Sequence, residues 1–197
     1  MMPEIDVYDF DHTLFRGDTY TVFLLYLFRR RPWLAPLSVF TLLGLLLMAL
    51  IPWDMRPGKT VAFLPLRLAR AWRYAGDFWA EMQAQGRIAP WFRPAENDVP
   101  TVVCTATPRF LVEPLFTGRL AIHTLIATEL DPRTLRFTGR NNRGPEKVRR
   151  LRALFPGARV RIAASDSLRH DKPLLRLARQ PMLVKDFTRQ TLRPEDL

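Results

Sequence analysis

Short runs of strand character alternate with longer segments of helical periodicity along the chain. Residues 144–155 keep apolar side chains at helical spacing behind a glycine and a proline, which predicts a helix. Residues 124–130 and 134–140 flank a turn sequence and predict a β-hairpin. Four further runs read as strands: 4–10, 100–108, 159–167 and 181–187. Strands that alternate with helices predict an α/β fold with a mostly parallel sheet.

Three of the expected strands end in polar side chains. The first ends in Asp9 and Asp11, the second in Thr105, and the third in Asp166. In a parallel sheet of this class, functional groups gather at the carboxyl ends of the strands. Alternate residues of a strand face the same side, so Asp9 and Asp11 lie side by side and repel each other unless a cation offsets their charge. The pattern therefore predicts a cation-binding site at this edge of the sheet.

A long apolar segment interrupts this alternation after the first strand. Residues 33–53 carry no charge over 21 positions, close to the roughly 20 residues that cross a bilayer. Arginines precede the segment at 29–31, and Arg56 and Lys59 follow it. Farther on, residues 60–82 predict a helix with a basic stripe at i, i+3 spacing, formed by Arg67, Arg70 and Arg73.

Composition narrows the class of partner. The 197 residues suffice for one domain with an insertion, and 30 basic against 19 acidic residues give a net charge of +11. A basic balance indicates an anionic partner such as nucleic acid, an anionic membrane surface or a phosphorylated substrate, or simply solvated basic faces in an arginine-rich chain. The single cysteine, Cys104, excludes an internal disulfide and fits a reducing cytoplasm. The acidic first residues are unlike an export signal.

The polar strand ends supply the groups for phosphoryl transfer. Asp9, Asp11, Asp166 and Asp171 offer only oxygen donors, which suit Mg²⁺ rather than zinc. One carboxylate can attack phosphorus, and a second at i+2 can protonate the leaving oxygen and later activate water. Thr105 is a hydrogen-bond donor for a phosphoryl oxygen, and Lys147 is a positive charge for the transition state.

These elements occur in the order found in a known family. Asp9-Phe10-Asp11-His12-Thr13-Leu14 resembles motif I of the haloacid dehalogenase-like (HAD) phosphatases, and Thr105 in "VVCTATP" resembles motif II. Lys147 in "GPEKV" resembles motif III, and "SDSLRHDKPLL", with Asp166 and Asp171, resembles motif IV. The likeness covers roughly residues 4–17 and 99–185.

The resemblance implies a Rossmann-like core with Asp9 as nucleophile and Asp11 as general acid and base. It implies Mg²⁺ held by the carboxylates of Asp9 and Asp166 and by the backbone carbonyl of Asp11. Asp171 is then a ligand through water or an orienting residue. Two positions depart from the family pattern, because His12 and Ser165 stand where many members have glycine. We expect His12 to point away from the site rather than to donate to phosphate, His170 to be exposed, and Cys104 to lie in the core.

The resemblance also implies a division of the chain into two parts. Residues 1–16 and 99–197 correspond to the catalytic core, and residues 17–98 to a helical cap inserted between motifs I and II. The layout is similar to the membrane-associated phosphatidylglycerophosphate phosphatases of the phosphoserine phosphatase-like branch. Those enzymes share an "RR-P" sequence before an apolar stretch and the "SDS…D-PLL" of motif IV. This likeness implies a lipid-phosphate substrate at the cytoplasmic face of the inner membrane, an anionic membrane surface as partner, and no nucleic acid.

Two other functions remain open. The first is a soluble cytoplasmic phosphatase for a small metabolite such as phosphoserine or histidinol phosphate, with residues 33–53 as a buried cap helix. The cap acids form no clear pair for a substrate ammonium, which disfavours amino-acid phosphates: Asp18, Asp54, Asp77 and Glu81. The second is a HAD scaffold that binds without turnover, which usually lacks a catalytic group. None is missing here.

Topology restricts how the apolar segment meets a bilayer. Asp9 precedes residues 33–53 and Asp166 follows them, so a single crossing would place the two carboxylates on opposite sides. The helix expected over 20–28 is too short to span, and the arginines of 60–82 cost several kcal/mol at mid-bilayer. We therefore expect 20–28 and 33–53 to form a hairpin that dips into one leaflet or lies in the interface, with both ends cytoplasmic.

Overall fold

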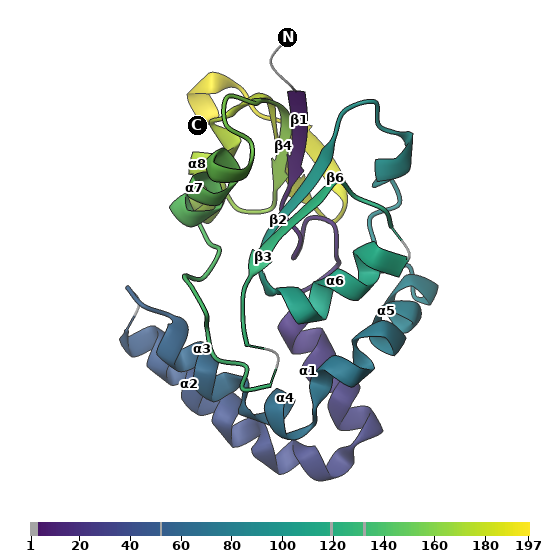
Figure 1. Ribbon diagram of the computed structural model, residues 1–197, viewed down its shortest axis with the longest axis vertical. Helices are drawn as coiled ribbons and strands as arrows, with labels where there is room; N and C mark the ends of the chain where they lie inside the picture. Colours follow the sequence, from purple (N-terminus) through teal and green to yellow (C-terminus); the bar gives the residue numbers. More distant parts are fainter. Residues whose placement is uncertain (1–3, 52, 119, 132) are drawn as a thin grey trace.

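The protein is built on one twisted sheet of mostly parallel strands. The computed structural model describes residues 4–51, 53–118, 120–131 and 133–197 (Figure 1). The six strands follow the order β3-β2-β1-β4-β5-β6, and only β6 runs antiparallel to its neighbour. Their bounds are Glu4–Tyr8 (β1), Thr101–Pro108 (β2), Thr124–Thr128 (β3), Arg159–Ser165 (β4), Ala178–Lys185 (β5) and Thr188–Thr191 (β6). The α/β fold expected from the sequence is confirmed.

β1 is the point at which the strand order reverses. It pairs with β2 on one side, where Val7 is opposite Val102, and with β4 on the other, where Val7 is opposite Ala163. Crossover helices connect the strands: α6 (Arg109–Gly118), α7 (Pro145–Leu154) and α8 (Leu168–Leu175). Ligands of open parallel sheets bind outside the carboxyl ends of the strands at such a reversal. The polar ends of β1, β2 and β4 therefore meet there.

The two faces of the sheet are covered differently. On one face, Val7 and Cys104 pack with Leu151 of α7 and Leu174 of α8. On the other face, the strand residues whose side chains point the opposite way belong to a larger cluster. This cluster includes α6 and two helices that precede β2, α1 (Thr19–Arg30) and α5 (Ala75–Ala84). The burial of Cys104 in the core is confirmed.

The segment between β1 and β2 is mostly helical. Besides α1 and α5, it contains α2 (Ser38–Leu50), α3 (Arg56–Ala62), α4 (Leu64–Leu68), and the 3₁₀ helices η1 (Pro32–Leu37), η2 (Ala71–Tyr74) and η3 (Pro94–Glu96). Helices α1, α2, α3 and α4 lie at the opposite end of the molecule from the N-terminus (Figure 1). A last 3₁₀ turn, η4 (Pro194–Asp196), ends the chain.

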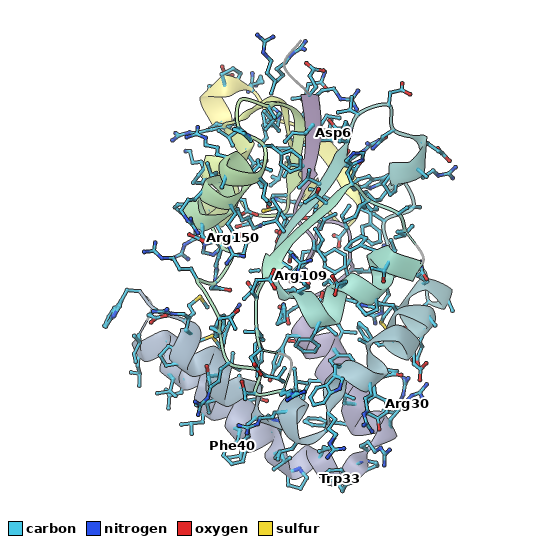
Figure 2. The ribbon with its side chains drawn as sticks, in the orientation of Figure 1. Asp6, Arg30, Trp33, Phe40, Arg109 and Arg150 are labelled. Atoms are coloured by element: carbon cyan, nitrogen blue, oxygen red, sulfur yellow. The ribbon has the colours of Figure 1, made fainter. Side chains whose placement is uncertain are left out.

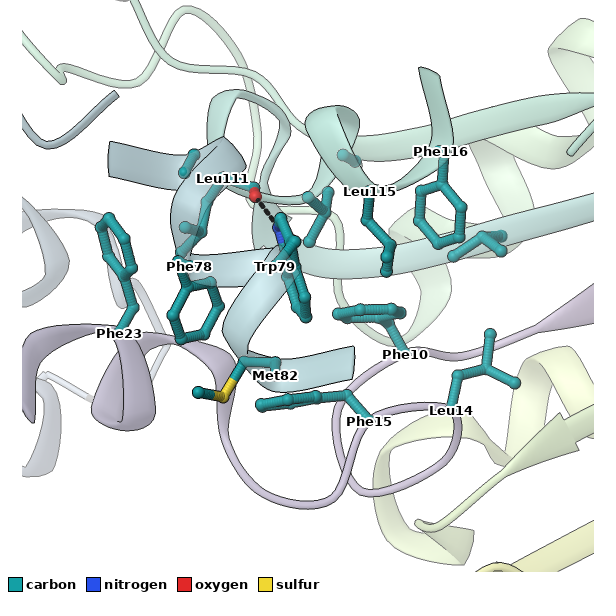
Figure 3. Packing of buried hydrophobic residues seen from close by; sticks show 14 of the residues in the cluster. Phe10, Leu14, Phe15, Phe23, Phe78, Trp79, Met82, Leu111, Leu115 and Phe116 are labelled. Atoms are coloured by element: carbon teal, nitrogen blue, oxygen red, sulfur yellow. Dashed lines mark hydrogen bonds between the residues drawn. The ribbon is translucent and has the colours of Figure 1, made fainter. Parts of the chain in front are cut away.

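Trp79 of α5 packs this helical segment against the elements next to the sheet. Its ring lies edge-on to Phe10 and Phe15, with centroids 5.5 and 5.2 Å away, and its indole nitrogen donates to the backbone oxygen of Leu111 at 2.6 Å (Figure 3). Phe10 and Phe15 belong to the loop after β1, and Leu111 belongs to α6. The inserted helices and the sheet therefore share one hydrophobic core.

Two sequence-based expectations about secondary structure were wrong. Residues 60–82 do not form one helix, because Pro65 lacks an amide hydrogen and Arg70 adopts a left-handed conformation with φ of 50°. The expected basic stripe is therefore split between α4, a turn and η2, although its three arginines are exposed. The expected hairpin after β3 is reduced to a single bridge between Leu130 and Phe137.

The apolar segment leaves most of its surface uncovered. Among the described residues, Pro32–Leu50 is the one helical stretch that is long and apolar enough to cross a membrane, judged by length and composition alone. Only 11% of its most apolar part is buried. Trp33 and Phe40 lie along the outer edge of the inserted helices (Figure 2). The exposed apolar residues of this stretch are Trp33, Val39, Leu42, Leu43, Leu45, Leu46 and Leu50.

The main partner of α2 is α3, although α1 also meets α2 at the hydrogen bond between the hydroxyls of Tyr20 and Thr41, 3.1 Å apart. Phe23 and Leu27 of α1 are fully buried in the shared core. The membrane hairpin expected for residues 20–28 and 33–53 stays a prediction. α2 approaches α3 backbone to backbone at Gly44 and Gly58. A Cβ on Gly44 would lie 2.4 Å from the backbone oxygen of Gly58, and one on Gly58 would lie 2.5 Å from that of Gly44. Only glycine allows this approach.

Gly44→Ala should destabilise the protein by about 2 kcal/mol, because the added methyl group must force α2 away from α3. The matched control is Gly76→Ala in α5, where nothing lies within 4 Å of the new Cβ. We expect that change to be neutral or stabilising by up to about 1 kcal/mol. Urea unfolding of both variants measures the difference. Equal stability of the two variants would contradict the close α2–α3 packing.

Candidate active site

A buried ammonium joins two carboxylates at the carboxyl end of the sheet. Nζ of Lys147, in the first turn of α7, donates to Oδ1 of Asp9 and to Oδ2 of Asp171, at 2.6 Å in each case. The side chains of Lys147 and Asp171 are each 3% exposed, and that of Asp9 is 11% exposed. Three segments far apart in the sequence therefore meet at Lys147. The structure brings together three of the residues that the sequence nominated.

Burial and pairing oppose each other in this group. Burial raises the pKa of Asp9 to about 7, and the Lys147 ammonium counteracts it. Burial by itself would lower the pKa of Lys147, but the attraction of Asp9 and Asp171 outweighs it and raises that pKa. One ammonium is thus shared by two carboxylates. Asp9 needs further positive charge nearby to be fully ionised at neutral pH.

Asp11 is held by hydroxyl and amide donors. The amide nitrogen of Thr19 donates to Oδ1 at 2.9 Å. The Thr19 hydroxyl also donates to Oδ1, and the Thr107 hydroxyl donates to Oδ2 at 2.6 Å. Burial raises the pKa of Asp11, and the charge of Asp18 acts in the same direction. A carboxyl group with a raised pKa, fixed beside Asp9, suits a general acid.

Thr107, rather than Thr105, borders the open site. Thr105 is 1% exposed, and its hydroxyl accepts from the amide of Thr107 at 3.0 Å. Ala106, Thr107 and Pro108 line the cavity described below. The phosphoryl-binding role predicted for Thr105 stays a prediction. Sequence reasoning missed Thr107 because both threonines end the same strand, and only the bend at its end decides which one faces the cavity.

Thr13 and Ser165 brace the loops that carry the aspartates. The hydroxyl of Thr13 accepts from the amide of Asp166 at 2.9 Å, which ties the loop after β1 to the end of β4. The hydroxyl of Ser165 donates to Oδ2 of Asp171 at 2.8 Å. Ser165, which departs from the family glycine, therefore adds a second donor to the carboxylate that also receives Lys147.

The residues fit a divalent cation held by few protein ligands. The described residues contain no cluster of three or more His, Cys, Asp or Glu side chains that could hold a metal ion. The four carboxylates that the sequence nominated all line one cavity, and their role as metal ligands stays a prediction. Asp11 and Asp171 accept hydrogen bonds from Thr107 and Lys147. Asp9 and Asp166 are the carboxylate ligands that the family resemblance implies. This oxygen-only pair suits Mg²⁺, which usually keeps several waters and takes one or two carboxylates.

Two of the three histidines lie at the cavity. His12 lines it and has φ of 57°, a left-handed conformation that favours the glycine common at this position. Our expectation that its side chain points away from the site stays a prediction. His170 is half-buried and also lines the cavity, so it is not simply exposed.

A cavity of roughly 420 Å³ opens from these groups toward the inserted helices. Its floor is formed by Asp9, Asp11, Lys147 and Asp166. The facing wall comes from α1, α2 and α3 and is mostly apolar, with Tyr20, Thr41, Leu45, Met48, Ala62 and Phe63. The site is thus a charged floor under a largely apolar wall.

Solved structures share this architecture. A protein of unknown function from Bordetella pertussis Tohama I has a TM-score of 0.55 and 18% identity, over 92% of this chain and 89% of its own. A HAD family hydrolase from Salmonella enterica serovar Typhi has a TM-score of 0.61 and 14% identity, over 94% of this chain and 65% of its own. A phosphoserine phosphohydrolase-like protein from Francisella tularensis has a TM-score of 0.52 and 14% identity, over 91% and 85%.

At these identities the structural likeness shows a shared fold. A sequence search of curated proteins gives no match. The haloacid dehalogenase-like hydrolase family, in contrast, matches residues 7–176, from the end of β1, just before Asp9, to just past α8, which carries Asp171. That match spans most of the chain and every motif residue of the site. The chain belongs to the haloacid dehalogenase-like hydrolase family.

Proposed function

We propose that this hydrolase is a Mg²⁺-dependent phosphomonoesterase with Asp9 as nucleophile. Oδ1 of Asp9 is held by Lys147, while Oδ2 receives no hydrogen bond from the described residues. Asp9 lines the cavity floor beside Lys147, so a phosphoryl group bound there lies between the attacking oxygen and the ammonium. Mg²⁺ held by Asp9 and Asp166 would supply the positive charge that keeps Asp9 ionised and neutralises phosphoryl oxygens.

The reaction divides into two displacements on phosphorus. An oxygen of Asp9 attacks the phosphorus atom, the ester P–O bond breaks, and Asp11 donates its proton to the leaving alkoxide. Asp11, now ionised, then takes a proton from water, whose oxygen attacks the aspartyl-phosphate and releases phosphate and the Asp9 carboxylate. Thr107 and Thr19 keep the Asp11 carboxyl in place for both proton transfers.

The substrate that we propose is a membrane lipid phosphate, most specifically phosphatidylglycerophosphate, which would be converted to phosphatidylglycerol. The observation that carries this proposal is the double role of α2. Thr41, Leu45 and Met48 line the catalytic cavity, while Leu42 and Leu46 are 65% and 55% exposed on the outside of the same helix. Leu45 lines the cavity and is itself 52% exposed. An exposed apolar face of this kind marks a membrane or protein contact.

Basic residues near α2 favour a membrane, rather than a protein, as the surface that α2 contacts. Arg31, Arg70 and Arg73 line a surface hollow together with the exposed apolar residues Trp33 and Leu68. Basic residues near anionic lipid each contribute about 1 kcal/mol. Two of the arginines that precede the apolar segment are instead paired with acids of α5, since Arg29 binds Glu81 and Arg30 binds Asp77.

The proposed orientation is interfacial. β1 precedes α2 and pairs directly with β2, which follows it, so α2 cannot cross a bilayer alone. We propose that α2 lies in the headgroup region of the cytoplasmic leaflet of the inner membrane, with the sheet in the cytoplasm.

A soluble phosphatase for a small metabolite is the second candidate. Asp18 is a cap carboxylate that lines the cavity, and it is the group that could bind a substrate ammonium. It already caps α1 by accepting from the amide and hydroxyl of Thr21, at 2.8 and 2.7 Å. Hydrolysis of phosphatidylglycerophosphate in vesicles, compared with phosphoserine and histidinol phosphate, separates the two candidates. Preference for either soluble ester would favour the second.

Asp9→Asn should lower kcat for phosphate release by at least about a thousandfold, because an amide oxygen is a far weaker nucleophile than a carboxylate. Far-UV circular dichroism should stay close to that of the wild type, since the amide retains an oxygen that can accept from Lys147. The readout is steady-state phosphate release with Mg²⁺ present. Turnover near the wild-type value in Asp9→Asn would rule out Asp9 as the nucleophile.

The double variant Leu42→Gln/Leu46→Gln should bind vesicles of phosphatidylglycerol at least about tenfold more weakly than the wild type, because each buried leucine contributes about 1.5–3 kcal/mol. Flotation with the vesicles measures the bound fraction. Leu154→Gln in α7 is the matched control, since Leu154 is 58% exposed but is not part of α2. Membrane binding that falls equally in both variants, or no binding by the wild type, would contradict the interfacial role of α2.

A further inference from the structure

A second pair of cations lines the catalytic cavity beyond Lys147. Lys59 comes from α3, and Arg143 comes from the segment just before α7. Both side chains are half-buried. The two residues lie on opposite sides of the boundary between the inserted helices and the sheet, so a ligand that contacts both is enclosed between them.

Neither cation forms an ion pair with a carboxylate in the part of the chain that the structure describes. Among the ion pairs of the described residues, other half-buried arginines find acids, since Arg150 binds Glu146 and Arg161 binds Asp6. Lys59 donates instead to the side-chain oxygen of Asn141 at 3.0 Å. Arg143 reaches the ring nitrogen Nε2 of His170 at 2.6 Å and the sulfur of Met55 at 2.9 Å.

The segment that presents Arg143 is rigidly anchored. The amide of the buried Asn142 side chain donates to the backbone oxygens of Thr105 and Ile126, at 2.9 and 2.8 Å. Its backbone nitrogen donates to the hydroxyl of Thr128 at 3.0 Å. Arg143 is therefore placed by the ends of β2 and β3, the same strand ends that shape the catalytic floor, and its position beside the cavity does not depend on a flexible loop.

The unpaired charges have an energetic consequence. Burial lowers the pKa of Lys59 to about 8, and the like charge of Arg143 acts in the same direction, against the smaller opposing effects of Asp11 and Asp18. Two neighbouring cations that form no ion pair disfavour each other, and an anion placed between them reduces that cost. Lys147 belongs to the phosphomonoester site on the cavity floor, where its ammonium binds Asp9 and Asp171, so a second anion is left to Lys59 and Arg143.

We propose that Lys59 and Arg143 form a second anion subsite, which selects phosphomonoesters that carry a phosphodiester elsewhere in the molecule. This inference rests on the proposed function and deepens it. The phosphomonoester occupies the floor at Asp9 and Lys147, the phosphodiester lies between Lys59 and Arg143, and the apolar remainder follows Leu45 and Met48 toward the outer face of α2.

The test compares soluble substrates, so that membrane binding plays no part. The wild type is assayed with glycerol 3-phosphate, which has only the monoester, and with deacylated phosphatidylglycerophosphate, which adds the diester. The measured quantity is the preference, defined as the ratio of kcat/KM for the second substrate to that for the first. Phosphoserine, which carries a carboxylate instead, tests whether the subsite accepts any anion.

We expect the wild type to prefer the diester-bearing substrate over both others. Lys59→Met and Arg143→Met should each lower the preference about ten- to a hundredfold, because each removes a charge-assisted hydrogen bond. Arg143→Lys, which keeps the charge, should retain part of it and remains informative if Arg143→Met does not fold. Lys185→Met is the matched control, since Lys185 is exposed and is not among the residues lining this cavity.

A wild type without preference, or a preference unchanged in both Lys59→Met and Arg143→Met, would overturn the subsite. An equal fall in Lys185→Met would overturn it as well. If the soluble diester-bearing substrate is preferred but phosphatidylglycerophosphate in vesicles is not hydrolysed, the subsite stands and the proposed lipid substrate fails. If the lipid is hydrolysed and the preference ignores Lys59 and Arg143, the subsite alone fails.

Discussion

The bridge from Lys147 to Asp9 and Asp171 is the interaction on which the site depends. It joins the end of β1, the start of α7 and the start of α8 through two hydrogen bonds of 2.6 Å in a nearly solvent-free position. A buried charge is stable only when it is paired, and removing one partner strands the others. The bridge therefore fixes the position of Asp9, the proposed nucleophile. Because one ammonium serves two carboxylates, it also leaves the site in need of a further cation.

The helices inserted after β1 shape the cavity above this group of charged residues. Close contact between Gly44 and Gly58 holds α2 flat against α3, so that one side of α2 closes the catalytic cavity while the other stays exposed and apolar. Lys59, which also lines the cavity, belongs to the same α3. Trp79 and the aromatic rings around it bind these helices to the sheet through a shared core. Substrate selection and membrane contact are thus proposed to act through one rigid unit.

The sequence predicted the sheet and the catalytic centre better than the cap. Polar residues at the ends of apolar runs pointed to Asp9 and Asp166, because strand ends converge whatever the details of the loops. Lys147 and Asp171 lie in α7 and α8, and it was the motif resemblance that pointed to them. Periodicity failed over 60–82, where a proline and a left-handed Arg70 override the helical pattern. It also could not assign α2 to α3, since a backbone contact at two glycines leaves little trace in hydrophobicity. Thr107, Lys59 and Arg143 were missed for a similar reason: their roles arise from tertiary contacts alone.

We propose that the carboxylate of Asp9 receives a phosphoryl group from a lipid phosphate, whose apolar part lies toward the outer face of α2. Rapid quenching in acid, during turnover of phosphatidylglycerophosphate in vesicles with Mg²⁺, followed by mass spectrometry of the peptides, tests it most directly. The account predicts a phosphoryl group on Asp9 that appears with the lipid substrate and is absent in Asp9→Asn. Steady consumption of the lipid with no phosphoryl group on Asp9, or with the group on another residue, would contradict it.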